Sequence, residues 1–177
     1  MPVNVRNIGA ARNAGGRVAK GETILFVDAD THPTVEAVRG VLTARRQGAI
    51  GGGTYCRLDE PVPRWAHAYA RWIWWWMRRL RWAPGCFFFV ARDVFEKVGG
   101  FDESLYASEE ITFSRAVKRR GPFAILPYPV VTSGRKLRTY SSRELLATIV
   151  RLSLRPWLLK RRSALELWYG RRRADRP

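Results

Sequence analysis

Two aspartates, Asp28 and Asp30, follow a short apolar run in this chain of 177 residues. The run, residues 23–27, is typical of a buried strand, and an open α/β sheet binds its ligand beyond the carboxyl ends of such strands. Residues two apart in extended backbone point the same way, so both carboxylates can face one ion. Such oxygen ligands suit Mg²⁺ or Mn²⁺, which take one or two carboxylates plus substrate phosphates. The alternative is a solvated turn before a helix that starts at Pro33.

The elements around this acidic pair follow an α/β order. Residues 6–19 are rich in alanine and glycine at helical spacing, which predicts a helix packed closely against a sheet or a ligand. A second helix follows the acidic turn, with Val35, Val38 and Leu42 on one side. Helix, buried strand, turn and helix in this order indicate an α/β domain.

Local signals also predict the elements of the middle of the chain. Residues 86–90 are expected to form a strand. Asp93 and Glu96 resemble a capping box that opens a short helix, which Gly99 ends. Ser108 is expected to cap a further helix that continues to about residue 119.

The glycines and prolines predict where extended structure is weak. Three consecutive glycines, residues 51–53, are expected to separate short extended pieces. Residues 125–132 are extended, but their two prolines argue against a central strand. Two basic amphipathic helices, residues 142–154 and 157–169, are predicted to follow, separated by a proline.

The stretch from Ala11 to Asp30 resembles the central block of glycosyltransferase family 2, which has an Ala-Arg-Asn helix, an Ala-x-Gly-Glu turn and a strand ending in Asp-x-Asp. The resemblance implies a GT-A fold in which the two aspartates hold a divalent cation, Mg²⁺ or Mn²⁺, that bridges the phosphates of a nucleotide-sugar donor. It also implies that Arg12 and Asn13 lie near the donor. The alternative is a solvated arginine and a helix-capping asparagine.

A second block downstream supports the same resemblance. Residues 85–103 resemble the family's strand and its Gly-Gly-Phe-Asp-Glu loop, and Glu109 and Glu110 follow where the family usually has Glu-Asp. The resemblance implies that Glu110 is the general base that takes the proton of the acceptor hydroxyl, although the family usually has aspartate there. We expect Glu109 to bind the acceptor. The alternative is that both glutamates only complement the dipole of the helix that they begin.

A third stretch, Thr-Ser-Gly-Arg-Lys at residues 132–136, resembles a late segment of the family. We expect Arg135 and Lys136 to bind the donor diphosphate through charge-assisted hydrogen bonds, with a plain basic turn as the alternative. The first strand of the family and its nucleobase-binding segment have no counterpart before Val3. We therefore expect a GT-A sheet without its first strand or strands, in a fragment, a chain with a misassigned start or a degenerate relative.

Residues 63–82 contain six tryptophans interleaved with arginines. One interpretation is an acceptor platform, with Trp72 and Trp76 stacking on sugar rings. Another is an interfacial helix with tryptophan at the depth of lipid headgroups. The third is a helix whose tryptophans fill the core.

Charge is the unusual property of the composition. Lys and Arg number 32 against 15 Asp and Glu, a net charge of +17, which favours an anionic partner such as nucleic acid, anionic lipid or a phosphorylated substrate. Two cysteines form no disulfide framework, and no apolar run suggests a signal core or a membrane span. These features predict a cytoplasmic protein, peripheral on the inner face of the plasma membrane.

The sequence thus predicts a partial, Rossmann-like GT-A domain at residues 1–134 and a basic helical tail at residues 135–177. The predicted activity is metal-dependent transfer of a sugar, with inversion, from a nucleotide-sugar donor to the hydroxyl of a sugar, lipid-linked or other acceptor. One alternative is an inactive remnant that binds a membrane or a partner. A nucleic-acid-binding protein is the other, but the sequence has no nucleic-acid motif, and two acidic pairs argue against it.

Overall fold

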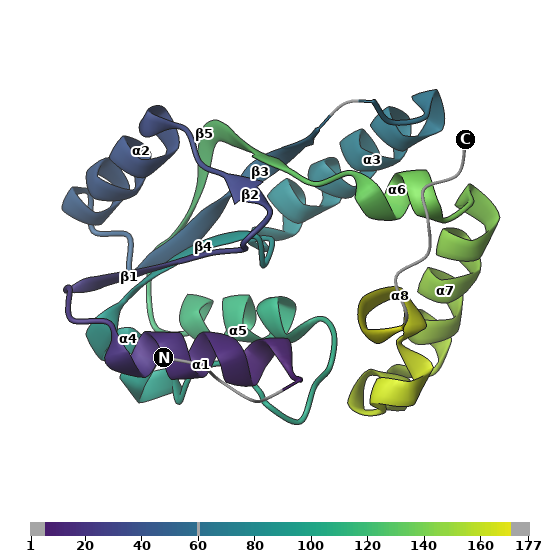
Figure 1. Ribbon diagram of the computed structural model, residues 1–177. Coiled ribbons are helices and arrows are strands. Elements are labelled where there is room, and N and C mark those ends of the chain that lie inside the picture. Colours follow the sequence, from purple (N-terminus) through teal and green to yellow (C-terminus); the bar gives the residue numbers. More distant parts are fainter. Residues whose placement is uncertain (1–5, 60, 171–177) are drawn as a thin grey trace.

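The computed structural model describes residues 6–59 and 61–170, and within them the strands form one mixed sheet in the order β1-β4-β3-β5-β2 (Figure 1). The strands are β1 (Thr23–Val27), β2 (Thr31–His32), β3 (Gly51–Leu58), β4 (Phe87–Ala91) and β5 (Phe123–Thr132). The pair β3 and β5 is parallel, and the other three neighbouring pairs are antiparallel.

Helices cover both faces of this sheet. The body contains α1 (Ile8–Val18), α2 (Val35–Arg46), α3 (Arg64–Leu80), α4 (Arg92–Val98) and α5 (Glu109–Lys118). Helix α2 lies on one face, whereas α1, α4 and α5 lie on the other (Figure 1). This layering confirms the predicted α/β fold class.

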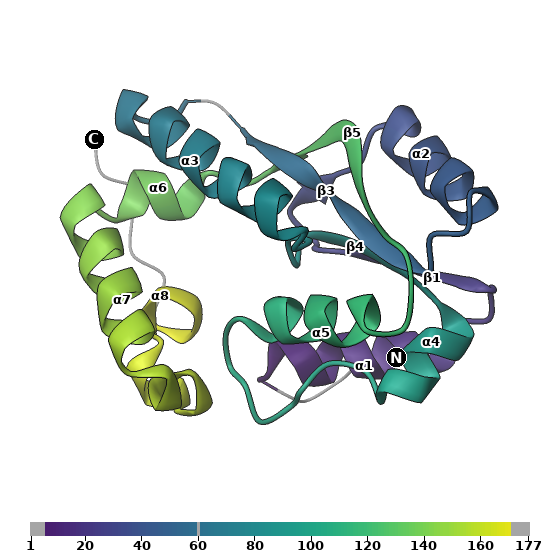
Figure 2. The same ribbon diagram turned by 180° about the vertical axis from the view of Figure 1, so that it is seen from behind.

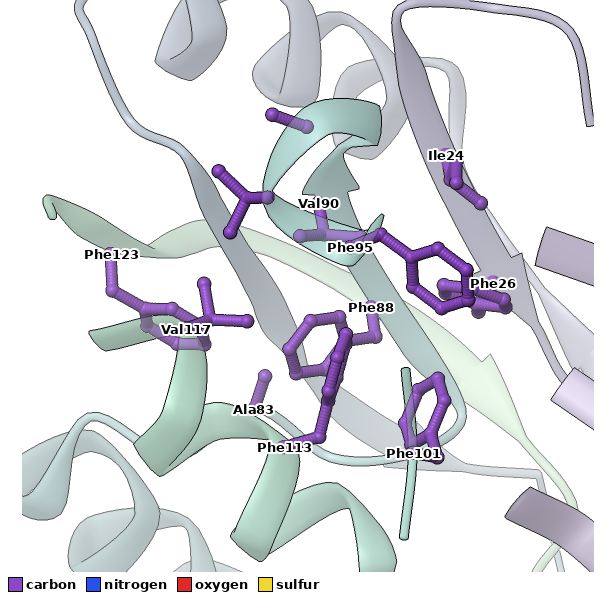
Figure 3. Close-up of a cluster of buried hydrophobic side chains, with 12 residues drawn as sticks. Ile24, Phe26, Ala83, Phe88, Val90, Phe95, Phe101, Phe113, Val117 and Phe123 are labelled. Carbon is purple, nitrogen blue, oxygen red and sulfur yellow. The ribbon is translucent and has the colours of Figure 1, made fainter. Parts of the chain in front are cut away.

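Aromatic side chains fill the interior between the sheet and α4 and α5. Phe88 of β4 and Phe113 of α5 are fully buried, with ring centroids 5.0 Å apart (Figure 3). A second buried cluster on the opposite face joins α2 to the sheet through Val41, Phe87 and Leu126. Strand β4 is buried along its whole length because it contributes to both clusters.

The prediction that residues 125–132 avoid the centre of the sheet is wrong. Strand β5 lies between β3 and β2. Its register to β3 shifts from Thr54 opposite Leu126 to Cys56 opposite Val130, so both prolines fall within the irregular stretch. The buried Thr54 hydroxyl shares its one hydrogen between the carbonyl oxygens of Leu126 and Tyr128 there. A bulge of this kind admits proline because regular ladder bonds are not formed across it.

The glycines at residues 51–53 lie within β3 and do not separate two strands. A Cβ atom at Gly52 would lie 2.0 Å from the carbonyl oxygen of Ala124 on β5. The absence of a side chain therefore allows β3 and β5 to approach closely.

Two of the predicted helix caps do not form: Ser108 has the predicted position without the hydrogen bond, and Ala91 is the N-cap of α4 in place of Asp93. Ser108 precedes α5, but its backbone is left-handed with φ 63° and its side chain makes no cap hydrogen bond. Asp93 lies in the first turn of α4 and its carboxylate accepts from Lys97 at 2.9 Å, so no capping box forms. A full capping box occurs instead at Ser141 and Glu144.

The C-terminal part begins with α6 (Arg135–Thr139) and α7 (Ser142–Leu154), the second of which matches its predicted bounds. The predicted last helix is broken into the 3-10 turns η1 (Pro156–Lys160) and η2 (Arg162–Ala164) and the short helix α8 (Glu166–Tyr169). These elements lie together at one side of the sheet and helices α1 to α5 (Figure 1). Leu152 and Leu165 pack on Ala107, in the loop before α5, so the tail contacts the body next to Glu109.

Residues 171–177, which include the last four arginines of the predicted tail, lie outside the described residues. In the part of the chain that the structure describes, every helix falls short of the length and apolar character that crossing a bilayer requires.

Candidate functional site

The first acidic pair lies in a tight turn at the end of β1. The Thr31 amide donates to the Asp28 carbonyl at 2.9 Å, and the Asp28 amide donates to the Cys86 carbonyl at 3.1 Å. Asp28 and Asp30 therefore do not face one side through strand alternation, as predicted, because Asp30 is in a turn and not in extended backbone. Both carboxylates remain accessible: the Asp28 side chain is 41% exposed, and Asp30 is exposed.

Arg12 of α1 connects this turn to α5. Its guanidinium donates to Asp28 Oδ1 at 2.9 Å, to the Gly85 carbonyl at 3.0 Å and to Glu109 Oε1 at 2.6 Å. Burial opposes the charged form of Arg12, but the Asp28 carboxylate, followed by Glu109, raises its pKa overall. Arg12 thus lies beside Asp28, with protein carboxylates as its partners, and its place near the donor stays a prediction.

Asn13, which the sequence places near the donor, instead holds the loop before α5. It is buried, and its amide donates to the Phe101 carbonyl at 2.9 Å and to Glu103 Oε1 at 2.8 Å, while the Phe101 amide donates back at 2.8 Å. Gly100, with φ 78°, allows the close approach, since a Cβ atom there would lie 2.4 Å from Asn13 Oδ1. Asn13 therefore positions the loop, and its amide is not presented to a ligand.

The two glutamates at the start of α5 have different surroundings. Glu109, predicted to bind the acceptor, is 3% exposed and ion-paired with Arg12. Glu110 is half-buried. Desolvation, followed by repulsion from Glu109, raises the pKa of Glu110 to about 7. A carboxyl group with such a pKa can exchange a proton near neutral pH, which is what a general base requires.

Lys136 approaches the acidic turn from α6. Burial lowers the pKa of its ammonium group, although the carboxylates of Asp30, Asp28 and Glu110 act in the opposite direction. Its Nζ lies 5.0 Å from the ring centroid of Trp168, a residue that the sequence analysis did not single out. Arg135, one residue earlier, is exposed. The carboxylates of Asp28 and Asp30 after β1 and of Glu110 in α5 therefore lie close enough to Lys136 of α6 to act on its charge.

Asp59 fixes the start of α6, the helix that carries Lys136, and no local pattern in the sequence pointed to it. Its Oδ1 accepts from the Gly134 amide at 2.6 Å and from Arg138 at 2.9 Å. The hydrogen bond from Arg138, followed by that from Gly134, lowers the pKa of the Asp59 carboxyl. The residue follows β3 directly, beside the end of β5, which is a tertiary contact and not a sequence pattern.

A cavity of about 900 Å³ lies between β3 and α3. Its α3 wall includes Trp74 and the exposed Trp75, whereas Trp72 and Trp76, which are also exposed, lie outside its lining. The choice of Trp72 and Trp76 as an acceptor platform therefore does not match this cavity. The helical spacing of Arg71, Trp74 and Arg78 is the sequence signal that groups the residues on the cavity side.

The carboxylate oxygens of the acidic turn suit a cation that takes its remaining ligands from water and substrate. Within residues 6–59 and 61–170, no three His, Cys, Asp or Glu side chains cluster as a complete metal site would. His32, two residues after Asp30, lies in β2 and is exposed. Two accessible carboxylates fit Mg²⁺ or Mn²⁺, which fill their remaining positions with water and substrate phosphates.

The comparison with protein families gives one finding. The family model described as Glycosyl transferase family 2 matches residues 1–99, which contain the acidic turn, Arg12 and the cavity between β3 and α3. No curated protein matches the chain.

Proposed function

The chain belongs to glycosyltransferase family 2, and from this premise we propose that it transfers a sugar, with inversion and with the help of a divalent cation, from a nucleotide-sugar donor to an acceptor hydroxyl. The observation that carries the proposal is the convergence of Asp28, Asp30, Glu110 and Lys136. Arg12 bridges Asp28, at the end of β1, to Glu109, which precedes Glu110 at the start of α5, and Lys136 of α6 is close enough to feel the carboxylates of Asp28, Asp30 and Glu110. Such a grouping of carboxylates with a partly buried cation fits a site for phosphates and proton transfer.

In the proposed reaction, Glu110 acts on the acceptor. The acceptor oxygen attacks the anomeric carbon, the bond from that carbon to the diphosphate oxygen breaks, and the hydroxyl proton passes to a Glu110 carboxylate oxygen. The nucleoside diphosphate leaves with the bonding electrons. Direct displacement of this kind inverts the anomeric configuration. The raised pKa of Glu110 makes its carboxylate a stronger base than an ordinary glutamate.

The donor diphosphate is proposed to lie between the acidic turn and α6. Asp28 and Asp30 would hold Mg²⁺ or Mn²⁺, which neutralises charge on the leaving diphosphate when it is bound. Lys136 and the exposed Arg135 would donate charge-assisted hydrogen bonds to phosphate oxygens. Arg12 would keep the turn and α5 at a fixed separation through its bonds to Asp28 and Glu109.

Donor binding is tested by calorimetry with Mn²⁺ and a panel of nucleoside diphosphates. We expect binding that a chelator abolishes, and we expect Asp30→Ala to remove most of it. Asp93→Ala is the matched control, since Asp93 is an exposed aspartate on α4. Binding to Asp30→Ala as tight as to the parent chain would refute the role of the acidic turn.

The role of Glu110 is tested by turnover with a donor found in that panel. Glu110→Gln should leave donor affinity nearly unchanged while lowering kcat by about 10²–10⁴-fold, as loss of a general base does. Glu109→Gln should lower kcat less and should lower stability, because Arg12 then loses a charged partner. Equal losses of kcat at the two positions would assign the pair a structural role only.

We also propose that the protein lies on anionic membrane surfaces. Helix α7 and the turn after it expose an apolar stripe on the side away from Leu145 and Leu152, namely Leu146, Val150, Leu154 and Trp157. Arg151 and Arg155 flank that stripe. Apolar side chains bordered by arginines suit an interface of lipid headgroups. A chain that bound vesicles of anionic lipid but no nucleoside diphosphate would fit the alternative of an inactive relative.

A further inference from the structure

The cavity between β3 and α3 arises because β4 pairs with only the first part of β3. Pairing with β4 extends from Gly51 to Gly53, while pairing with β5 continues to Leu58. Beyond Gly53, α3 lies along the side of β3 that β4 leaves (Figure 2), and Tyr55 meets Trp74 with ring centroids 6.5 Å apart. The space left between the two elements is the cavity of about 900 Å³.

Positive charge and aromatic rings line this cavity together. The lining includes four arginines and three aromatic rings, namely Arg57, Arg71, Arg78, Arg79, Tyr55, Trp74 and Trp75. All four arginines are exposed. In the described ranges, 6–59 and 61–170, none of the four forms an ion pair with a carboxylate.

Four like charges around one cavity repel each other, and no described carboxylate lies within ion-pairing distance of them. An anion in the cavity would remove this repulsion and accept hydrogen bonds from planar guanidinium groups, which match phosphate and carboxylate geometry. The indole faces of Trp74 and Trp75 add flat apolar surface of the kind on which a sugar ring or an acyl chain packs. The chemistry of the lining therefore selects a ligand that is both anionic and partly apolar.

The cavity adjoins the proposed donor site through two cysteines. Cys56 lines the cavity, and a hydrogen bond with the Cys86 thiol, together with burial, raises the pKa of the Cys56 thiol. The carbonyl group of the same Cys86 accepts from the Asp28 amide at 3.1 Å. One residue thus separates the wall of the cavity from the acidic turn.

We infer that this cavity binds the acceptor, and that the acceptor is a phosphate ester whose organic part is a sugar or a lipid. The inference rests on the proposed function, because it names the substrate class for the same reaction. Arg71, Arg78 and Arg79 hold the phosphate, and Trp74 and Trp75 contact the organic part. The acceptor hydroxyl extends past Cys56 toward the acidic turn.

The first test is titration of the full chain, in the presence of a chelator, with glucose 1-phosphate, followed by tryptophan fluorescence and calorimetry. The chelator removes metal-dependent diphosphate binding, so a signal reports the cavity. Each lost charge-assisted hydrogen bond should weaken binding by about tenfold to a hundredfold. We therefore expect Arg71→Gln with Arg78→Gln to abolish measurable binding. Arg46→Gln, which removes an exposed charge from α2, should bind as the parent chain does.

A second arm separates the two sources of phosphate. Vesicles of phosphatidic acid in phosphatidylcholine, compared with phosphatidylcholine alone, present the same phosphate monoester on a lipid. Arginine-dependent binding to the sugar phosphate assigns a soluble acceptor, and arginine-dependent binding only to the phosphatidic acid vesicles assigns a lipid-borne one. Absence of arginine-dependent binding to both probes overturns the inference.

A third arm distinguishes an acceptor site from a second view of the donor site. In the presence of Mn²⁺ and a saturating nucleoside diphosphate, the phosphate ester should still bind with its affinity changed less than tenfold. Competition between the two ligands would overturn the acceptor assignment. Diphosphate binding without phosphate ester binding would leave the proposed function standing and refute this inference alone, whereas the reverse pattern would refute the proposed donor site.

Discussion

The pKa of Glu110 predicts how the stability of the protein changes with pH. An ordinary glutamate has a pKa of 4.5, and the folded protein raises that of Glu110 to about 7, first by desolvation and second by repulsion from Glu109. A carboxyl with a raised pKa favours folding in its protonated form. Its contribution to the free energy of unfolding is therefore complete below pH 4.5 and is lost as the pH rises through about 7. The full loss is worth about 3 kcal/mol.

Replacement of the carboxyl by an amide of the same shape should remove this dependence. We expect Glu110→Gln to be about as stable as the parent chain at pH 4.5 and more stable at pH 8, by up to about 3 kcal/mol. Urea unfolding at several pH values in this range, followed by fluorescence, measures the difference. Glu96→Gln on α4 is the control, since Glu96 is exposed and its replacement removes the same charge.

A difference in the free energy of unfolding between Glu110→Gln and the parent chain that stays constant from pH 4.5 to 8 would contradict this prediction. A parent chain that gained stability over the variant as the pH rose would show instead that attraction to Arg12 outweighs desolvation. Either result would also weaken the assignment of Glu110 as a base with raised basicity.

Four further predictions concern stability and membrane binding. Arg12→Ala should lower the free energy of unfolding by about 3–5 kcal/mol, because it leaves Glu109 buried without its ionic partner; a loss below about 1 kcal/mol in urea unfolding would contradict this. Gly52→Ala should prevent recovery of folded protein, because its Cβ would lie 2.0 Å from a carbonyl oxygen of β5. Gly15→Ala on α1 should stabilise the protein by about 0.5–1 kcal/mol in the same assay, because the added Cβ would have no atom of another part of the chain within 4 Å. Co-sedimentation should show binding to phosphatidylglycerol but not phosphatidylcholine vesicles, weakened by salt and by Leu154→Glu; binding that ignores both changes would contradict the membrane proposal.

Local patterns were sufficient to predict several elements of the fold. Strand β1 and helix α7 have the predicted bounds, because an apolar run between turn residues and an amphipathic stretch before a proline act locally. The central position of β5 could not be predicted in this way. Its prolines are accommodated by hydrogen bonds from Thr54, more than seventy residues earlier, and no local pattern reports that partner.

The residues of the candidate site also fall into two groups, those predicted from motifs and those that only the fold reveals. The acidic turn, Glu110 and Lys136 were predicted from motifs, and the structure places them near one another. Asp59 and Trp168 were missed because they reach the site through the end of β3 and the packing of the tail. The resemblance gave Asn13 a ligand role, and only the fold shows that its amide is used to hold a loop.

Helix α3 has a consequence for the kinetics of local opening. Of its 17 residues only Ala66 is buried, whereas α5 buries Glu109, Phe113, Ser114 and Val117 in 10. The free energy of opening a segment follows the contacts that the opening breaks. Amide protons of α3 should therefore exchange with solvent much faster than those of α5 in the ligand-free chain. A ligand that contacts both α3 and β3 would slow the exchange of the α3 amides selectively. Deuterium uptake along α3 would therefore report whether the cavity is occupied, even under conditions in which no turnover is measured.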